Sequence, residues 1–123
     1  MRRRSATLTG QELEIMKVVW ERDRVTVRDV YEALLEHRKV AYTTVMTMMK
    51  ILEQKKYLKK TQLDRAYVYR PAKPKGQVIS AMVKEFVNRV FNGSAEPLLV
   101  HLVQEHKLSR EDLEEIAKLR RKS

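Results

Sequence analysis

The chain has 123 residues, 43% of them hydrophobic, and a formal net charge of +10, which suits one compact domain, or a small domain with an appendage, around a small core. The absence of cysteine excludes disulfides, thiolate metal sites and cysteine nucleophiles. No apolar run approaches the roughly 20 residues of a membrane span, and no apolar signal-peptide segment follows Arg2, Arg3 and Arg4, so we expect a cytoplasmic protein.

Capping patterns predict the first two helices. Thr9 and Glu12 form a capping box that predicts a helix from about Gly10 to Glu21. The predicted buried stripe of this helix has apolar residues at helical spacing, namely Leu13, Met16, Val19 and Trp20. Ile15 and Val18 fall outside the stripe, which indicates a second contact. A second helix, capped by Thr26, has its apolar positions at Val27, Val30, Tyr31, Leu34 and Leu35.

The segment from Ala41 to Leu58 predicts a third helix, beginning near Tyr42, with two different faces. At about 100° per residue, one core-facing stripe comprises Val45, Met48, Met49 and Leu52. The opposite face carries short hydroxyls and an amide around one lysine, namely Thr43, Thr47, Lys50 and Gln54, with no acid until Glu53 at its margin. Such side chains can enter a DNA major groove and bond base edges. The alternative is a merely exposed, threonine-rich helix.

An alternating pattern follows the third helix and predicts a β-hairpin. Its strands span residues 57–62 and 65–70, around a turn at Leu63 and Asp64. Tyr67 and Tyr69 share one face, and Ala66 and Val68 share the other. Three short helices followed by a basic hairpin are typical of a winged helix-turn-helix, so we expect a mainly α fold with a small β-hairpin wing, and assign residues 1–73 to a DNA-binding domain. A protein-interaction module or a nonspecific architectural winged helix is the alternative.

Residues 74–123 are predicted to form a helical dimerisation domain. Asn92 and Gly93 end its first helix, Ser94 caps a second with Pro97 in its first turn, and Ser109 and Asp112 form a capping box for the last. These short helices hold more apolar surface than they can bury alone, so we expect a homodimer. The candidate dimer contacts are Ile79, Met82, Val83, Phe86, Val90, Phe91, Leu98, Leu99, Leu102, Leu113 and Ile116. Folding back onto the first domain is the alternative.

The candidate DNA contacts divide into residues that reach bases and residues that bind the backbone. The base contacts lie on or beside the outer face of the third helix, and are Thr43, Thr44, Met46, Thr47 and Lys50. The backbone contacts are Thr26, Arg28, Tyr42, Lys59, Lys60 and Arg65. Residues 1–73 hold 17 Lys or Arg against 9 Asp or Glu, which favours nucleic acid as the partner, although membrane surfaces and acidic proteins also attract basic proteins. Together with the outer face of the third helix, this charge predicts double-stranded DNA. The arginines at positions 2–4 form either an arm into a groove or a basic tail.

Catalytic residues are not evident. The histidines are His37, His101 and His106, and His101 with Glu105 would supply only two ligands to a metal ion. The three glycines each lie at a predicted helix boundary and form no phosphate loop. We therefore expect a protein that is not an enzyme and that has no metal or cofactor.

Several segments of the chain match a known family in order, from Leu8 to about Leu119. They are Leu8-Thr9 with Glu12, Glu14-Ile-Met16 with Trp20, Thr26-Val-Arg-Asp-Val-Tyr-Glu32, Ala41-Tyr-Thr-Thr-Val-Met-Thr47, Arg65-Ala-Tyr-Val-Tyr-Arg-Pro71, and Phe91-Asn-Gly-Ser94. This set resembles the penicillinase-repressor and methicillin-resistance repressor family, which also includes copper-responsive repressors. The resemblance implies a homodimeric, winged-helix transcriptional repressor that binds a palindromic operator.

The resemblance also implies a mode of induction. In antibiotic-responsive relatives, a membrane sensor for β-lactams leads to proteolysis within the C-terminal helices, so a sensor peptidase is an implied partner. An Asn-Phe cleavage pair is expected about where this chain has His101-Leu102, which leaves the cut and its position open. Copper-responsive relatives carry a C-terminal cysteine cluster, so its absence here excludes copper sensing through thiolates.

Overall fold

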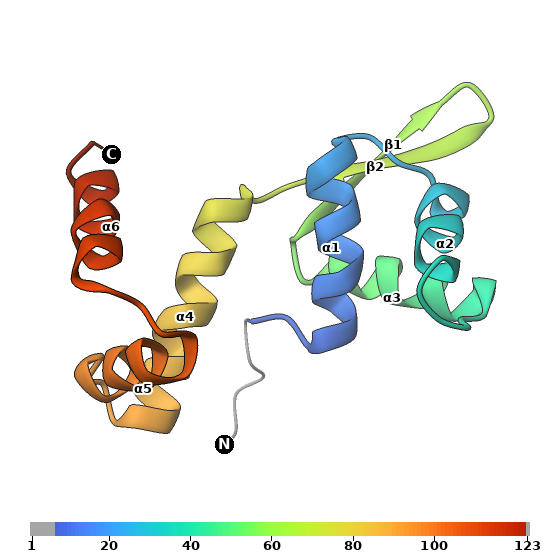
Figure 1. Cartoon of the computed structure of the whole chain (residues 1–123). Helices are drawn as coiled ribbons and strands as arrows, with labels where there is room; N and C mark the ends of the chain where they lie inside the picture. Colours follow the sequence, from blue (N-terminus) through green and yellow to red (C-terminus); the bar gives the residue numbers. More distant parts are fainter. Residues whose placement is uncertain (1–6, 123) are drawn as a thin grey trace, which may run out of the picture. The chain divides into compact units, whose positions relative to one another are not determined.

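The structure is a computed structural model that describes residues 7–122, and in this range it has six helices and one antiparallel hairpin (Figure 1). The elements are α1 (Gly10–Arg22), α2 (Val27–Leu35), α3 (Tyr42–Gln54), β1 (Leu58–Leu63), β2 (Ala66–Pro71), α4 (Lys75–Phe91), α5 (Glu96–His106) and α6 (Arg110–Lys122). Two compact units divide between Met82 and Val83, within α4. The predicted fold class, mainly helical with a two-stranded wing after the third helix, is confirmed.

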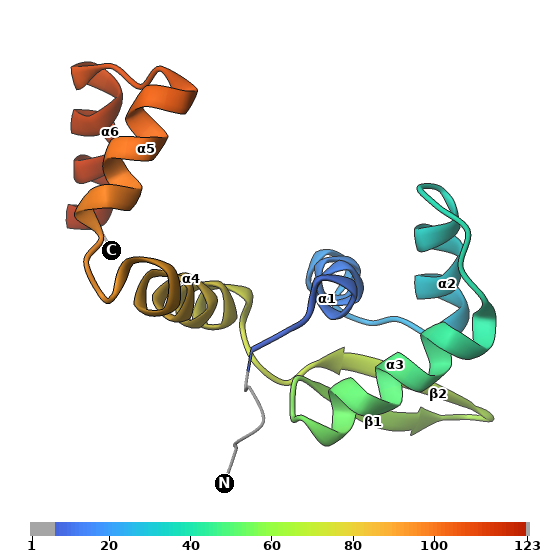
Figure 2. The same cartoon turned by 90° about the horizontal axis from the view of Figure 1, so that it is seen from below.

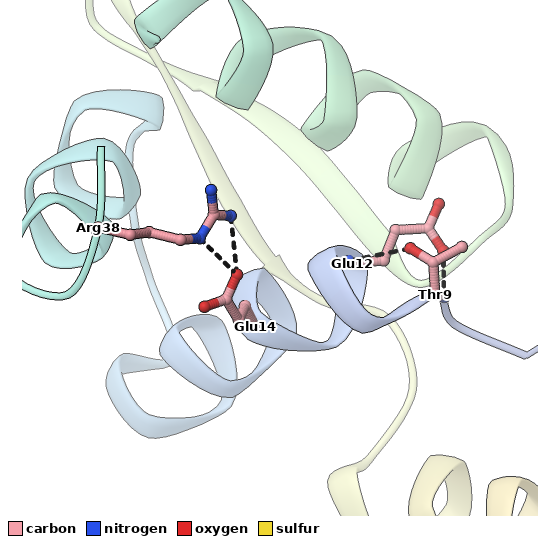
Figure 3. Close-up of polar contacts among 4 residues, drawn as sticks. All are labelled: Thr9, Glu12, Glu14 and Arg38. Atoms are coloured by element: carbon pink, nitrogen blue, oxygen red, sulfur yellow. Dashed lines mark hydrogen bonds and ion pairs between the residues drawn. The ribbon is translucent and has the colours of Figure 1, made fainter. Parts of the chain in front are cut away.

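Reciprocal side-chain caps fix where three of the helices begin. At α1, the Thr9 N–H donates to Glu12 Oε1 at 2.9 Å and the Glu12 N–H donates to Thr9 Oγ1 at 3.2 Å (Figure 3). Thr26 and Asp29 cap α2 in the same way, at 2.9 and 3.1 Å. At α6 the predicted box between Ser109 and Asp112 is confirmed, at 2.8 and 3.0 Å. These bonds satisfy N–H groups that a helix leaves unpaired at its start.

The core of the first unit lies where α1, α2, α3 and the hairpin meet. Its fully buried side chains come from the three helices and the α1–α2 connection: Ile15, Met16, Val19, Val25, Val30, Val45, Met49 and Leu52. The hairpin adds the buried residues Leu58, Val68 and Tyr69. The predicted stripe of α3 is confirmed, with only Met48 half-buried. In α4, Val78 is buried in this core and Met82 packs against it. The start of α4 therefore belongs to the first unit.

The buried arc of α1 is wider than the predicted stripe, and Leu35 of α2 is more exposed than predicted. Ile15, for which the sequence indicated a second contact, is buried, whereas Leu13 and Trp20 are half-buried and pack against the core. The arc is wide because α1 packs against α2, α3 and β2. Leu35 is 43% exposed. It is the last residue of α2, and that helix buries only Val30 and Leu34.

The hairpin is held in place by a second pairing outside its own ladder. Leu63 pairs with Ala66 at the tip, so each strand lies one residue later than predicted, and Asp64 turns the chain at φ 57°. Tyr69 exchanges backbone hydrogen bonds of 2.7 and 3.0 Å with Val25, in the α1–α2 connection. Since β1 also packs against α3, the hairpin is fixed to the helices at its base (Figure 2).

The second unit contains the end of α4 with α5 and α6. Asn92 (φ 54°) and Gly93 (φ 88°) end α4, and the Gly93 N–H donates to the Val87 carbonyl at 3.1 Å, as in a Schellman motif. The prediction that Ser94 caps the next helix is wrong, because the Ser94 N–H bonds Phe91 in the turn that closes α4. Ala95 occupies the cap position instead, and no side chain bonds there.

Candidate nucleic-acid interface

A groove of about 400 Å³ opens where the start of α2, the outer face of α3 and the hairpin meet. Its lining includes seven of the eleven predicted DNA contacts: Thr26, Arg28, Tyr42, Met46, Thr47, Lys50 and Lys60. Thr43, Thr44, Lys59 and Arg65 are exposed but do not line it. The groove thus brings together residues that lie up to 43 positions apart in the chain, Thr26 and Tyr69 being the extremes.

The outer face of α3 forms the floor of this groove. Val45, Met49 and Leu52 are completely buried on the inner face, which turns Thr47 and Lys50 outward. Among the described residues, the Lys50 ammonium has no ion-pair partner. The Thr47 hydroxyl and the Lys50 ammonium lie one helical turn apart, and both are suited to hydrogen bonds with base edges.

The start of α2 and the start of α3 form one wall around Tyr42. The Arg28 guanidinium lies 5.9 Å from the centre of the Tyr42 ring, and Tyr31 meets that ring edge-on at 5.4 Å. Arg28 also reaches Glu32 at 3.5 Å, but both side chains are mostly exposed, so this ion pair restrains Arg28 little. The Thr26 hydroxyl accepts a bond from the Asp29 N–H, which leaves its proton available for a phosphate.

The hairpin forms the opposite wall. Lys60 Nζ lies 4.5 Å above the Tyr67 ring and 3.8 Å from Glu53 Oε1. The lining here also includes Ala66, Tyr67 and Tyr69, which the sequence analysis did not name as site residues. The alternating pattern of the strand predicted that both tyrosines share one face, but it did not predict which face of the strand meets α3.

Three acidic side chains of the first unit are paired with basic side chains away from the groove lining. Glu12 Oε1 accepts from Lys55 at 2.9 Å, Arg70 lies 3.1 Å from Asp23, and Arg38 bonds Glu14 Oε1 through two nitrogens at 2.8 and 3.1 Å (Figure 3). The bond from Arg38 holds the pKa of Glu14 below its ordinary value. These carboxylates are each matched by a cation of the fold, so the basic excess of the unit remains available to a polyanion.

The predicted dimer contacts differ in their surroundings. Ile79 and Met82 lie in the first unit and are half-buried. Phe91, Leu98, Leu102 and Leu113 are half-buried in the second unit. The remaining members of the set are exposed, namely Val83, Phe86, Val90, Leu99 and Ile116.

The predicted cleavage region lies inside α5, where His101 is exposed and Leu102 half-buried.

Within residues 7–122, no group of three or more acidic or histidine side chains is arranged to hold a metal ion. No helix of that range is long and apolar enough to cross a membrane.

A three-helix core with a hairpin wing and a polar, cation-bearing groove on its third helix defines a winged helix-turn-helix DNA-binding protein. Residues 8–122 match the family model described as penicillinase repressor. The chain therefore belongs to the penicillinase repressor family and is a DNA-binding transcriptional repressor, not an enzyme.

Named relatives and a solved structure agree with this assignment. The transcriptional regulator BlaI of Mycobacterium tuberculosis is 36% identical over 76% of this chain and 69% of its own. The penicillinase repressor of Bacillus licheniformis is 27% identical over 89% and 85%. The monomeric form of B. licheniformis BlaI in complex with the blaP half-operator matches 57% of this chain and 85% of that chain, with 27% identity and a TM-score of 0.51.

Proposed function

We propose that this protein represses transcription by binding a palindromic operator as a homodimer, with one winged-helix unit on each half-site. The observation that carries the proposal is the groove in which Thr47 and Lys50 of α3 face Lys60 of the wing. The B. licheniformis relative, whose monomeric form binds a half-operator, supports one half-site for each protomer. Such a protein acts in the bacterial cytoplasm, where its operator lies.

Within each half-site, α3 enters the major groove and the surrounding residues fix its register. Thr43, Thr44, Met46, Thr47 and Lys50 reach the base edges, because they lie on or beside the exposed face of α3. The backbone contacts are Thr26, Arg28, Tyr42, Lys59, Lys60 and Arg65, which come from the start of α2, the start of α3 and the wing. The groove residues among them lie on both sides of α3, so they would bind phosphates that flank the bases being read.

Residues 74–123 supply the dimer contact. None of residues 83–119 is buried, and large apolar side chains such as Val83, Val90 and Ile116 are about half exposed, at 51%, 48% and 52%. Exposed apolar surface of this kind marks an association site, and a second copy supplies a matching surface through two-fold symmetry. Dimerisation also places two recognition helices one or more turns of duplex apart.

Proteolysis of the C-terminal helices would release the repressor from its operator. A sensor peptidase that cleaves near His101 and Leu102 would separate α6 from α4 and remove part of the dimer contact. Each half-site alone then binds weakly, because the second binding event is no longer intramolecular. Both residues lie inside a helix, so cleavage requires local unwinding of α5.

Binding to three duplexes tests the operator proposal. The duplexes are the upstream region of the protein's own gene, the same region with one half-site scrambled, and a mixed-sequence control. We expect two protomers on the first by sedimentation, a large loss of affinity on the second, and weak, salt-dependent binding to the third. Equal affinity for all three, unchanged in Thr47→Ala, would instead identify a nonspecific architectural or protein-interaction module.

A further inference from the structure

Tyr67 is an exposed aromatic residue of the groove that has no role in the fold's core. Its side chain is 53% exposed, whereas Tyr69, on the same face of β2, is 6% exposed. The pairing of Tyr69 with Val25 fixes the base of the strand, and Tyr67 lies two residues nearer the tip. The strand therefore holds Tyr67 at the rim of the groove, beyond the packed part of the wing.

One face of the Tyr67 ring is already occupied by a cation. Lys60 Nζ lies 4.5 Å from the ring centre, within the range of a cation–π interaction. Within residues 7–122, no hydrogen bond of the Tyr67 hydroxyl is present. The ring thus presents a phenolic donor to the groove, with a positive charge beside it.

A donor next to an ammonium matches the chemistry of a phosphate diester, and an aromatic ring edge suits the deoxyribose that follows it. We propose that Tyr67 is a DNA-binding residue of the wing, which donates its hydroxyl to a backbone phosphate while Lys60, stacked on its ring, supplies the positive charge. The proposal rests on the operator-binding function above, because it needs DNA to lie in this groove.

Glu53 limits the same contact. Its carboxylate lies 3.8 Å from Lys60 and about one-third of its side chain is exposed at the end of α3. In the free protein Glu53 therefore holds the ammonium that a phosphate would bind, and it also repels an approaching phosphate. DNA binding exchanges one anionic partner of Lys60 for another, so Glu53 lowers the affinity of the wing for every duplex, whatever its sequence.

The test uses the full chain and a fluorescent mixed-sequence duplex, because a backbone contact does not depend on the operator. Tyr67→Phe removes only the hydroxyl and keeps the ring beneath Lys60, so we expect binding about 3- to 10-fold weaker with an unchanged salt slope. Lys60→Met weakens binding and lowers the salt slope by about one. Glu53→Gln strengthens binding. Lys17→Met, which removes one charge at an exposed position of α1 outside the groove, is the matched control for Lys60.

Two results would overturn the inference. One is that the Tyr67→Phe variant binds the mixed-sequence duplex as tightly as the wild type does, while its thermal unfolding by circular dichroism shows that it is folded. The other is weaker or unchanged binding in Glu53→Gln, which would remove Glu53 as a competitor. Thr47→Ala separates this inference from the proposed function. If Thr47→Ala loses the preference for the upstream duplex and Tyr67→Phe still weakens binding, both the operator function and the wing contact stand. If the wild type shows no sequence preference but Tyr67→Phe still weakens binding, only the wing contact stands.

Discussion

Lys55 Nζ lies 2.9 Å from Oε1 of Glu12, and so the last turn of α3 is tied to the first turn of α1. The same oxygen accepts the Thr9 N–H of the capping box at 2.9 Å. The side chains of Glu12 and Lys55 are 7% and 18% exposed, so the pair is well shielded from water. The pair therefore restrains the position of α3 against α1, and neither residue lines the groove.

Loss of Lys55 should destabilise the first unit. Lys55→Met leaves the Glu12 carboxylate shielded without its cation, and we expect unfolding to become easier by about 1–3 kcal/mol. Urea denaturation followed by circular dichroism measures this change. Lys17→Met, at an exposed position of α1, is the matched control and should change the free energy of unfolding by less than about 0.5 kcal/mol. Equal stability of the two variants would contradict a stabilising pair.

Stability should also fall in acid because of Glu12. Burial raises the pKa of this carboxyl, but the bonds from the Thr9 backbone and from Lys55 outweigh it and leave the pKa below the ordinary 4.5. A group with a lowered folded pKa stabilises the protein above its unfolded pKa, and that stabilisation is lost as pH falls through the folded pKa. The urea midpoint of the wild type should therefore drop below about pH 4.5, and it should drop less steeply in Glu12→Gln.

Base readout by α3 predicts a loss of specificity in Thr47→Ala. We expect affinity for the operator to fall by about 1–3 kcal/mol while affinity for a mixed-sequence duplex is nearly unchanged. Thr61→Ala makes the same substitution at an exposed position of β1 outside the groove. Competition gel shifts with both duplexes measure the ratio, and an equal effect of the two substitutions would contradict a base contact by Thr47.

The dimer proposal predicts that Val90→Asp produces monomers. Val90 is 48% exposed on α4, and a carboxylate there would be desolvated in an interface between two copies. Sedimentation should shift to the monomer, and affinity for the full operator should fall on the order of 10²-fold or more. Affinity for a single half-site should stay the same. Arg89→Ala, at the neighbouring exposed position, serves as control, and a Val90→Asp protein that sediments as a dimer would refute this contact.

Local sequence signals predicted most of the first unit. The capping box at Thr9 and the cap at Thr26 depend on residues close in the chain, as does the box at Ser109 in the second unit. The stripe of α3 repeats over about two turns, so these patterns are visible in the sequence. Ile15 and Val18 indicated a second contact of α1, but the width of its buried arc depends on how many elements surround the helix, which the sequence does not show. Ser94 was misassigned because its N–H closes the preceding turn.

The parts of the site that the sequence did not indicate are those made by long-range pairing. Tyr69 meets Val25 across 44 positions, and this bridge decides which face of the wing turns toward α3. Tyr67 lines the groove on the same strand face as Tyr69, and Ala66 lines it at the tip of the hairpin. The Lys60–Glu53 ion pair links β1 to α3, and the relative position of these two elements is defined only by the fold.

The position of Trp20, whose Nε1 donates to the Lys73 carbonyl at 3.0 Å within the first unit, has a spectroscopic consequence. Trp20 is the single tryptophan of the chain, and all five tyrosines also lie before residue 83, whereas both phenylalanines lie after it. Emission excited near the indole band therefore reports on the DNA-binding unit alone. A chain whose C-terminal helices melt or are cut away should keep the native emission spectrum of Trp20, so fluorescence and far-ultraviolet circular dichroism together can resolve the unfolding of the two units without any label.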